Sequence, residues 1–190
     1  MKTKNIMMVG VGGQGSLLAS KLLGSLLLEK GYDVKVSEVH GMSQRGGSVV
    51  TYVRYGERVF SPIIDIGQAD MIVAFELLEA ARWVSYLAPG GIVITNSQQI
   101  NPMPVITGMA SYPENLMEKM LNLGVNVKAI DALSAAKEVG IPRAVNVVLI
   151  GALSKTFDFT EAEWMDAIDS CVPEKFRQLN KEAFLKGRNN

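Results

Sequence analysis

Residues 6–15 read Ile6-Met7-Met8-Val9-Gly10-Val11-Gly12-Gly13-Gln14-Gly15, and this stretch decides the fold. Four consecutive apolar residues are typical of a parallel strand that is buried on both faces. The glycine-rich segment behind them matches G-x-G-x-x-G, and a helix is predicted from about Ser16 to Lys30, closing at Gly31. A strand, a glycine loop and a helix in this order indicate an α/β fold.

Working outward, the rest of the chain alternates in the same way. Short β-branched runs predict further strands at 32–36, 49–53, 69–75, 92–95 and 125–130. Helices are expected at 76–83, at 114–120, at 131–138 after an Asp131 cap, from Pro142, at 161–169 behind a Thr160 capping box, and from Pro173 to about Phe184.

Three segments carry more specific expectations. Residues 54–58 are expected to turn the chain into a strand at Val59-Phe60, which would give an antiparallel hairpin. Residues 96–111 are broken by prolines and a glycine and are expected to form a lid or a short extra strand, and residues 186–190 are expected to fray. The prediction is a three-layer, Rossmann-like, mostly parallel sheet with an antiparallel hairpin, in a single domain over residues 1–190 with C-terminal helices from about 142.

Composition excludes several classes of function. Lys plus Arg and Asp plus Glu number 19 each, so the broad basic surface of a nucleic-acid binder is not expected. No run reaches the roughly 18 apolar residues of a membrane span. The single Cys171 rules out an internal disulfide and a cysteine-ligated metal site built by this chain alone, and it fits a reducing, cytoplasmic setting.

The glycine loop has a known physical use. Gly10 would permit a tight turn, Gly12 a close approach of a ligand, and Gly15 close packing of helix on strand, with Gly13 and Gln14 between them. The helix that follows would present free amides to an anion. Glu38, at the end of the next strand, stands where a ribose-binding acid is expected. A dinucleotide site and an anion-binding or interface loop both remain open.

A second polar segment, Glu38-Val39-His40-Gly41-Met42-Ser43-Gln44-Arg45-Gly46-Gly47-Ser48, links two predicted strands and contains the only His. It would lie at a strand's carboxyl end, where open α/β sheets place ligands. Arg45 offers a planar set of donors for a carboxylate or phosphate. The alternative is a long glycine-rich turn with a surface Arg.

Other polar residues have simple structural interpretations as well. Asn146 lies among apolar neighbours and is either a satisfied hydrogen-bonding residue or part of an active site. Glu76 and Glu79 are expected to be acids of a first helical turn. Cys171 and His40 lie too far apart in sequence to suggest a nucleophile–base pair.

Taken together, the sequence motifs resemble one family. The glycine loop 10–15, the polar loop 38–48, the run 69–80 and the segment Asn146-Val147-Val148-Leu149-Ile150-Gly151-Ala152 are similar to the gamma-type catalytic domain of 2-oxoacid:ferredoxin oxidoreductases, which is also the pyruvate/ketoisovalerate oxidoreductase catalytic domain. Within that family the chain looks most like the beta subunits of the indolepyruvate type. The resemblance covers nearly the whole chain and implies oxidative decarboxylation of an aryl pyruvate to an acyl-CoA, with electrons passing to ferredoxin.

The resemblance also implies where the cofactors lie. Thiamine diphosphate proteins of this kind carry a Gly-Asp-Gly motif that is absent here, and one cysteine cannot hold an iron–sulfur cluster. Thiamine diphosphate, Mg and the clusters are therefore expected on a large partner subunit, with CoA as co-substrate and no metal on this chain. The chain alone would be inactive and would complete the partner's site. A homodimer of the isolated chain is also expected to be possible.

The residues assigned to this site fall into two groups. The catalytic candidates are His40, Ser43, Gln44 and Arg45, and the residues expected to face substrate or cofactor are Gly10, Gly12, Gly13, Gln14, Gly15, Glu38 and Asn146. Two other functions stay open: a stand-alone NAD- or nucleotide-binding protein, and a purely structural assembly module.

Overall fold

The computed structural model describes residues 3–41 and 46–190. Its centre is a six-stranded sheet in the order β2-β3-β1-β4-β5-β6. The strands are β1 Lys4–Val11, β2 Asp33–His40, β3 Ser48–Gly56, β4 Ala69–Ala74, β5 Leu87–Asn96 and β6 Asn126–Ile130. The helices are α1 Ser16–Glu29, α2 Leu77–Trp83, α3 Met103–Ile106, α4 Leu116–Asn122, α5 Ala132–Glu138, α6 Val145–Leu153, α7 Glu161–Cys171 and α8 Glu174–Asn189, with short 3-10 turns at Val84–Tyr86, Pro142–Ala144 and Ser154–Thr156.

The sheet is mixed, and one strand runs against the others. β1, β4, β5 and β6 pair in parallel, whereas β3 pairs antiparallel with both β1 and β2. The register aligns Met8 of β1 with Thr51 of β3, and Thr51 with Glu38 of β2. The predicted mostly parallel sheet with an antiparallel hairpin is confirmed.

The hairpin itself lies elsewhere than predicted. It joins β2 to β3 through the polar loop, and the expected strand at Val59-Phe60 does not form. Long-range side-chain contacts hold this segment in an irregular path instead. Asp33 accepts a hydrogen bond from the Val59 amide at 2.8 Å, and the Arg54 guanidinium binds two carbonyls further along at 2.8 and 2.9 Å. A local pattern of β-formers cannot reveal such contacts.

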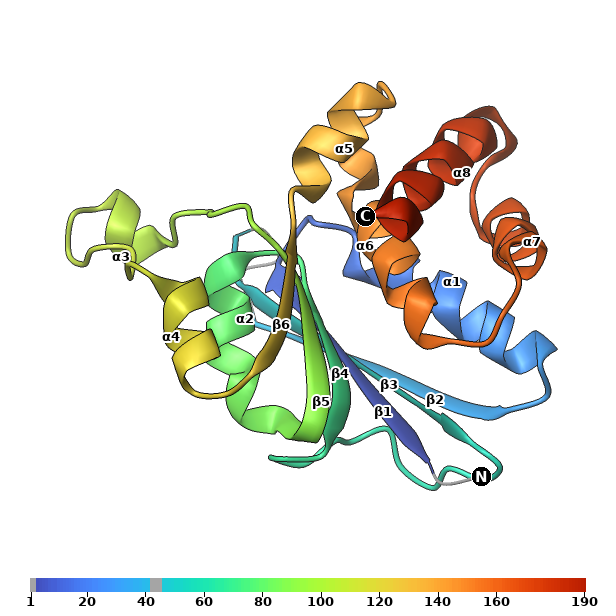
Figure 1. Cartoon of the computed structure of the whole chain (residues 1–190), viewed down its shortest axis with the longest axis horizontal. Coiled ribbons are helices and arrows are strands. Elements are labelled where there is room, and N and C mark those ends of the chain that lie inside the picture. The colour runs from blue at the N-terminus through green and yellow to red at the C-terminus, as the bar shows by residue number, and fades with distance from the viewer. Residues whose placement is uncertain (1–2, 42–45) are drawn as a thin grey trace.

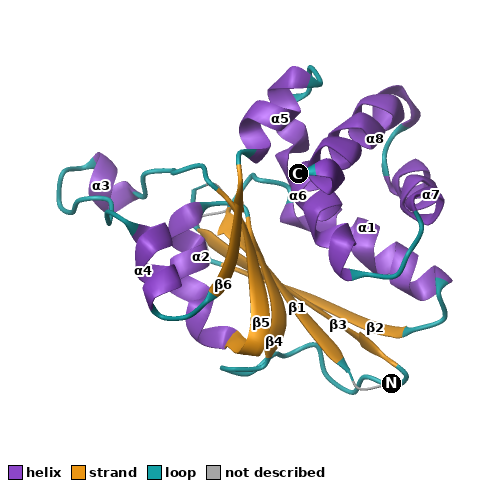
Figure 2. Cartoon of the chain, in the orientation of Figure 1, coloured by secondary structure: helices purple, strands orange, loops and turns teal. Residues whose placement is uncertain are grey.

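Helices cover both faces of the sheet, and each face has its own core. In Figures 1 and 2, α1, α5, α6, α7 and α8 lie on one side of the sheet, and α2 and α4 lie on the other. Alternation along β1 divides its side chains between the cores: Ile6 and Met8 join the first, and Met7 and Val9 join the second. All four are fully buried, as the continuous apolar run predicted.

Two segments outside the sheet differ from expectation. β5 runs on to Asn96, and residues 97–111 do not form the short extra strand; a short helix, α3, forms in their middle, and a lid role for this segment stays a prediction. Helix α8 does not fray at 186 but continues to Asn189, because Gly187 is buried against α6 and Arg188 donates to the Ser154 hydroxyl at 2.7 Å. Across the described residues, none of the helices has both the length and the apolar character that a bilayer crossing requires.

Candidate functional site

The described candidate residues converge on one edge of the sheet. The glycine loop follows the end of β1, His40 ends β2, and Phe75 and Glu76 follow the end of β4. Because β3 runs the other way, its first residue, Ser48, lies at this same edge. This carboxyl edge is where open α/β sheets bind their ligands.

The glycine loop is held by contacts within the chain. The Gly12 amide donates to the Gly47 carbonyl at 2.8 Å, and the Gly46 amide donates to the Gly12 carbonyl at 3.3 Å. The backbone of the glycine loop is therefore paired with the end of the polar loop. Gly12, which the sequence offered for close approach of a ligand, is also approached closely by the chain itself.

Gln14 closes the crevice between β1 and β4. Its side-chain carbonyl accepts from the Val11 amide at 2.8 Å, and its amide donates to the Phe75 carbonyl at 2.9 Å. Helices leave β1 and β4 toward opposite faces, so this is the point where such a fold opens its ligand crevice. A Cβ on Gly10 would lie 2.8 Å from the Gln14 oxygen, which explains the glycine at that position.

Asn146 supports the glycine loop from the other side. It is 3 % exposed, and its amide donates to the Gly15 carbonyl at 3.1 Å. Gly15 has φ 84°, and a Cβ there would lie 2.6 Å from the Asn146 amide nitrogen. Both observations favour the structural interpretation of Asn146, which fixes the loop where α1 begins.

Two hollows flank the glycine loop. The first, of about 430 Å³, is lined by Gly12, Gly13, Gly15, Ser16, Leu17, Glu38, His40 and Val49. Glu38 lies in it and accepts from the Thr51 hydroxyl at 3.2 Å and from the Ser16 hydroxyl at 3.5 Å. His40 is exposed at its rim. Its lining thus combines one carboxylate and one imidazole with the glycine loop and the first residue of α1.

The second hollow, of about 630 Å³, lies on the other side of the loop. It is lined by Gly13, Gln14, Gly15, Leu18, Gln98, Ile100, Leu133, Pro142, Arg143, Val145 and Asn146. Arg143 is exposed and is the charged residue of this lining, which makes it the natural partner for an anionic group. Sequence reasoning missed Arg143, because a single Arg at a helix start carries no local signal.

The position of Glu38 differs from that of a ribose-binding acid. In a dinucleotide-binding fold that acid ends the strand next to β1. Here antiparallel β3 occupies that position, and Glu38 lies one strand further out. The strand order at this edge therefore differs from that of the dinucleotide site that the glycine motif suggested.

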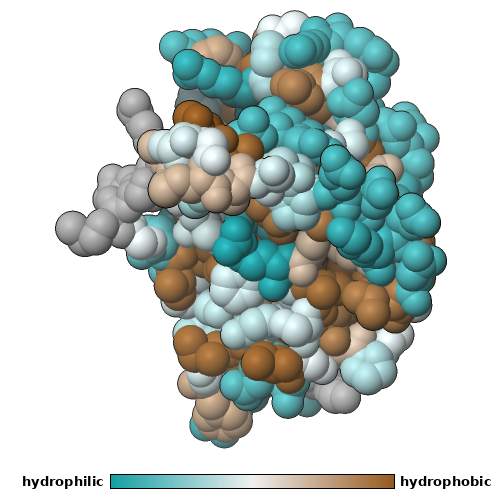
Figure 3. Space-filling view, turned by 90° about the vertical axis from the view of Figure 1, so that its left-hand side faces the viewer, coloured by the Kyte–Doolittle hydropathy of each residue, from teal (hydrophilic) through white to brown (hydrophobic). Residues whose placement is uncertain are grey.

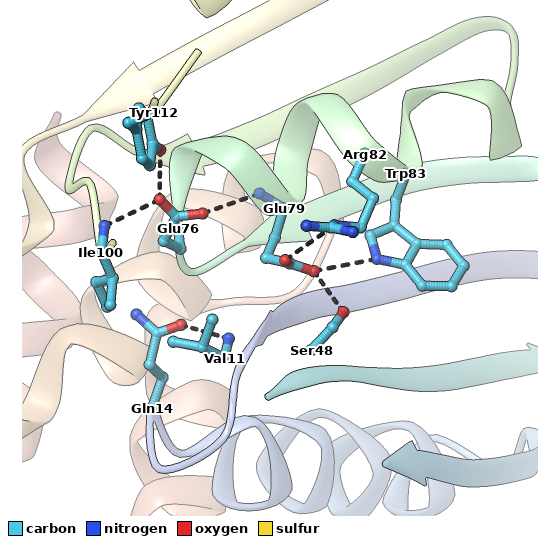
Figure 4. A network of polar contacts seen from close by, with 9 residues as sticks. All are labelled: Val11, Gln14, Ser48, Glu76, Glu79, Arg82, Trp83, Ile100 and Tyr112. Carbon is cyan, nitrogen blue, oxygen red and sulfur yellow. Dashed lines mark hydrogen bonds and ion pairs between the residues drawn. The ribbon is translucent and has the colours of Figure 1, made fainter. Parts of the chain in front are cut away.

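Two buried carboxylates stand behind the carboxyl edge, and Figure 4 shows their contacts. Glu76 is 1 % exposed and Glu79 is 3 % exposed, although both were expected only as acids of a first helical turn. Glu76 does cap α2, accepting from the Glu79 amide at 2.9 Å. Glu79 accepts from the Ser48 hydroxyl at 2.5 Å, from the Trp83 indole at 3.3 Å and from Arg82 at 3.1 Å. It therefore ties α2 to the residue where the polar loop ends.

Glu76 joins two distant points of the following segment. Its second oxygen accepts from the Ile100 amide at 3.1 Å and from the Tyr112 hydroxyl. Burial and the hydrogen bond to Glu76 raise the pKa of Tyr112, so the phenol stays protonated and acts as the donor. One carboxylate thus holds both ends of the segment that carries α3.

Three of the four catalytic candidates, Ser43, Gln44 and Arg45, lie outside the described residues, and only His40 is placed. Within residues 3–41 and 46–190, no three His, Cys, Asp or Glu side chains form a group that could hold a metal ion. The polar groups that the structure places here are suited to binding and positioning.

Comparison with known proteins is consistent over nearly the whole chain. Residues 5–190 match the family described as "Pyruvate ferredoxin/flavodoxin oxidoreductase". "Indolepyruvate oxidoreductase subunit IorB" of Thermococcus kodakarensis is 46% identical, with 98% of this chain and 95% of the relative covered, and the protein of the same name from Archaeoglobus fulgidus is 37% identical, with 97% and 94% covered.

Solved structures share the fold. The gamma subunit of a keto/oxoacid ferredoxin oxidoreductase from Geobacter sulfurreducens has a TM-score of 0.72 at 23% identity, covering 98% of this chain and 96% of that one. A 2-oxoglutarate:ferredoxin oxidoreductase from Magnetococcus marinus has a TM-score of 0.74 at 22% identity; all of this chain matches 31% of that chain. At this level of identity the likeness supports the fold alone, and there the fold is one part of a longer polypeptide.

Proposed function

The chain belongs to the pyruvate ferredoxin/flavodoxin oxidoreductase family, and from that premise we propose that it is the small subunit of a 2-oxoacid:ferredoxin oxidoreductase of the indolepyruvate type. In this role it completes the site in which a large partner subunit decarboxylates an aryl pyruvate and transfers the acyl group to CoA. The observation that carries the proposal is the 46% identity to a subunit of that name, over 95% of its length.

We propose that the cofactors reside on the partner subunit, because the groups that this chain offers suit them poorly. Iron–sulfur clusters need several thiolates, and the sequence has one cysteine. A magnesium diphosphate needs oxygen ligands in an open site. The buried carboxylates Glu76 and Glu79 are instead bound to neighbouring donors, and the Gln14 side chain is hydrogen-bonded to the backbone of β1 and of the residue that follows β4. A reducing, cytoplasmic setting stays a prediction, which rests on the single cysteine.

The chain's own contribution would be binding and orientation at the carboxyl edge. We propose that His40, Ser43, Gln44 and Arg45 contact the substrates, with Arg45 pairing with the carboxylate of the 2-oxoacid or a phosphate of CoA. The rigid support comes from the glycine loop 10–15, which Gln14 and Asn146 hold in place. A site supported on such a scaffold keeps its substrate groups in a fixed orientation.

Anaerobic reconstitution tests this function. The tagged chain is purified from its native cells with its associated large subunit, the two are separated, and acceptor reduction by indolepyruvate, CoA and thiamine diphosphate is followed for each and for the mixture. Activity that requires both chains is expected. A large subunit that is fully active alone, or no large partner at all, would refute the proposal.

A substitution separates a substrate contact from a mere interface. Arg45→Ala is expected to lower kcat/KM at least about tenfold while the complex still assembles, since an ion pair to a substrate carboxylate is lost. Arg58→Ala is the matched control, because Arg58 is exposed at the opposite edge of the sheet and stacks on Phe60. Loss of assembly with Arg45→Ala would favour the structural-module alternative.

A further inference from the structure

We propose that residues 97–115, called the arm below, form the docking element for the large subunit and insert into an uncharged, apolar surface of it. The inference rests on the proposed function and adds to it the place and the chemistry of the contact. The arm leaves β5 at the carboxyl edge, carries α3 and returns to α4, and Figure 1 shows it projecting from the body of the molecule.

The length of the arm exceeds what the fold needs. It links the end of β5 at Asn96 to the start of α4 at Leu116, and connections from strand to helix in such folds usually take about 2–6 residues. Connections several times longer are commonly functional. The extra residues therefore need an explanation outside the fold.

The arm is apolar and exposed at its tip. Met103 is 64% exposed, Ile106 65% and Met109 76%, and Figure 3 shows tan and brown patches among white and teal ones on this side of the molecule. Residues 96–113 contain no Asp, Glu, Lys or Arg, in a chain where 20% of residues are charged. The cores of protein interfaces have this composition, with charged residues depleted and Met enriched.

The arm is held in one shape although it exposes apolar side chains. Inside it, the Val105 amide donates to the Pro102 carbonyl at 2.9 Å, and the Ala110 amide donates to the Pro104 carbonyl at 3.0 Å. At its base, Glu76 binds the Ile100 amide and the Tyr112 hydroxyl. A preorganised arm loses little conformational entropy when a partner covers it, which favours binding.

The position of the arm favours the large subunit as its binding partner. Gln98 and Ile100 line the second hollow together with Gln14 and Arg143. A partner that covers the arm is therefore continuous with the edge that the proposed function assigns to substrates. The uncharged tip favours a neutral apolar partner surface, because burying an unpaired partner charge against it would be costly.

The chain offers a matched control. Phe60, Ile63 and Ile66 are 81%, 50% and 68% exposed, close to the values in the arm. They belong to the connection between β3 and β4, which lies at the opposite, amino edge of the parallel strands. They are interspersed with Glu57, Arg58 and Asp65, so they differ from the arm in place and in charge.

The test compares two triple variants of the full chain, M103S/I106S/M109S in the arm and F60S/I63S/I66S as control. Anaerobic titration calorimetry measures the Kd of each for the large subunit, and urea unfolding of each isolated chain checks that it is folded. The arm variant is expected to bind at least about 100-fold more weakly, as for the loss of an apolar interface core, and the control less than about threefold.

Distinct results separate the two levels of inference. Equal affinity of wild type and arm variant, or loss only in the control, overturns the docking arm and leaves the proposed function standing. Sedimentation showing that the wild-type chain self-associates through the arm, with the large subunit bound independently of it, overturns the arm as well. If the wild-type chain binds no large subunit, the proposed function and the arm both fall.

Discussion

Glu76→Ala tests whether one buried carboxylate holds the arm to the body of the protein. Glu76 is 1 % exposed and accepts three hydrogen bonds, from the Glu79 amide, the Ile100 amide and the Tyr112 hydroxyl. Alanine removes the acceptor of all three. The buried Glu79 amide and the half-buried Ile100 amide and Tyr112 phenol then lose their acceptor.

The magnitude follows from two opposing effects. Each hydrogen bond to a charged group contributes about 1.5–3 kcal/mol, and removing a buried charge recovers part of that sum because its desolvation penalty disappears. We expect the free energy of unfolding to fall by about 3 kcal/mol, which for a domain of this size lowers Tm by about 6–12 °C. Glu76→Gln keeps one acceptor oxygen, and we expect a loss of about 1–1.5 kcal/mol.

Urea unfolding and calorimetry measure the global effect, and hydrogen exchange at the Ile100 amide measures release of the arm. Glu114→Ala is the control, since Glu114 is exposed just beyond the arm's uncharged stretch, and it should change stability by less than about 0.5 kcal/mol. If Glu76→Ala leaves both the free energy of unfolding and the exchange of Ile100 at wild-type values, the clamp does not exist.

Three further predictions concern the scaffold. Gly15→Ala should lower the free energy of unfolding in urea by about 3 kcal/mol, because Gly15 has φ 84° and a Cβ there would lie 2.6 Å from the Asn146 amide nitrogen. Gly13→Ala should lower it by only about 1 kcal/mol, because Gly13 has φ 100° but faces open space. Equal losses in the two variants would contradict the packing argument. Gly187→Ala should prevent folding as judged by circular dichroism, since its Cβ would lie 1.8 Å from a backbone oxygen of α6. If the free energy of unfolding of this variant lies within about 1 kcal/mol of wild type, α6 and α8 can move apart without cost, and the prediction is wrong. Burial raises the pKa of Tyr55 to about 12 from 10.0, so its neutral form is favoured in the fold and stability should fall as pH rises from about 10 toward 12; urea midpoints across that range should fall less steeply for Tyr55→Phe.

Much of the fold was predictable because its signals are local. The apolar run 6–9, the glycine at 31 and the Thr160 capping box each act within a few residues, and the structure confirms the strand, the helix end and the cap. The strand at Val59-Phe60 was wrong because Asp33 and Arg54 decide the path of that segment from a distance. The continuation of α8 was missed because contact with α6, and not local propensity, holds its last turn.

The site was predictable only in part, for the same reason. The sequence indicated the glycine loop and Glu38, and the structure brings them together with His40 at one hollow. The sequence could not show that both the oxygen and the nitrogen of the Gln14 side-chain amide bind backbone groups, nor that Glu76 is buried. Those outcomes depend on which strands are neighbours, and residue spacing does not determine strand order.

The antiparallel strand β3 also has a consequence for how the chain folds. Its pairing with β2 is a hairpin of adjacent segments, whereas its pairing with β1 and that of β1 with β4 join residues far apart in sequence. Hairpins close in microseconds, while contacts of high sequence separation form more slowly because a longer loop must be ordered first. We therefore expect β2 and β3 to pair before β1 takes its place between β3 and β4. β2 and β3 would then form an early folding unit, already paired when the rest of the sheet assembles beside it.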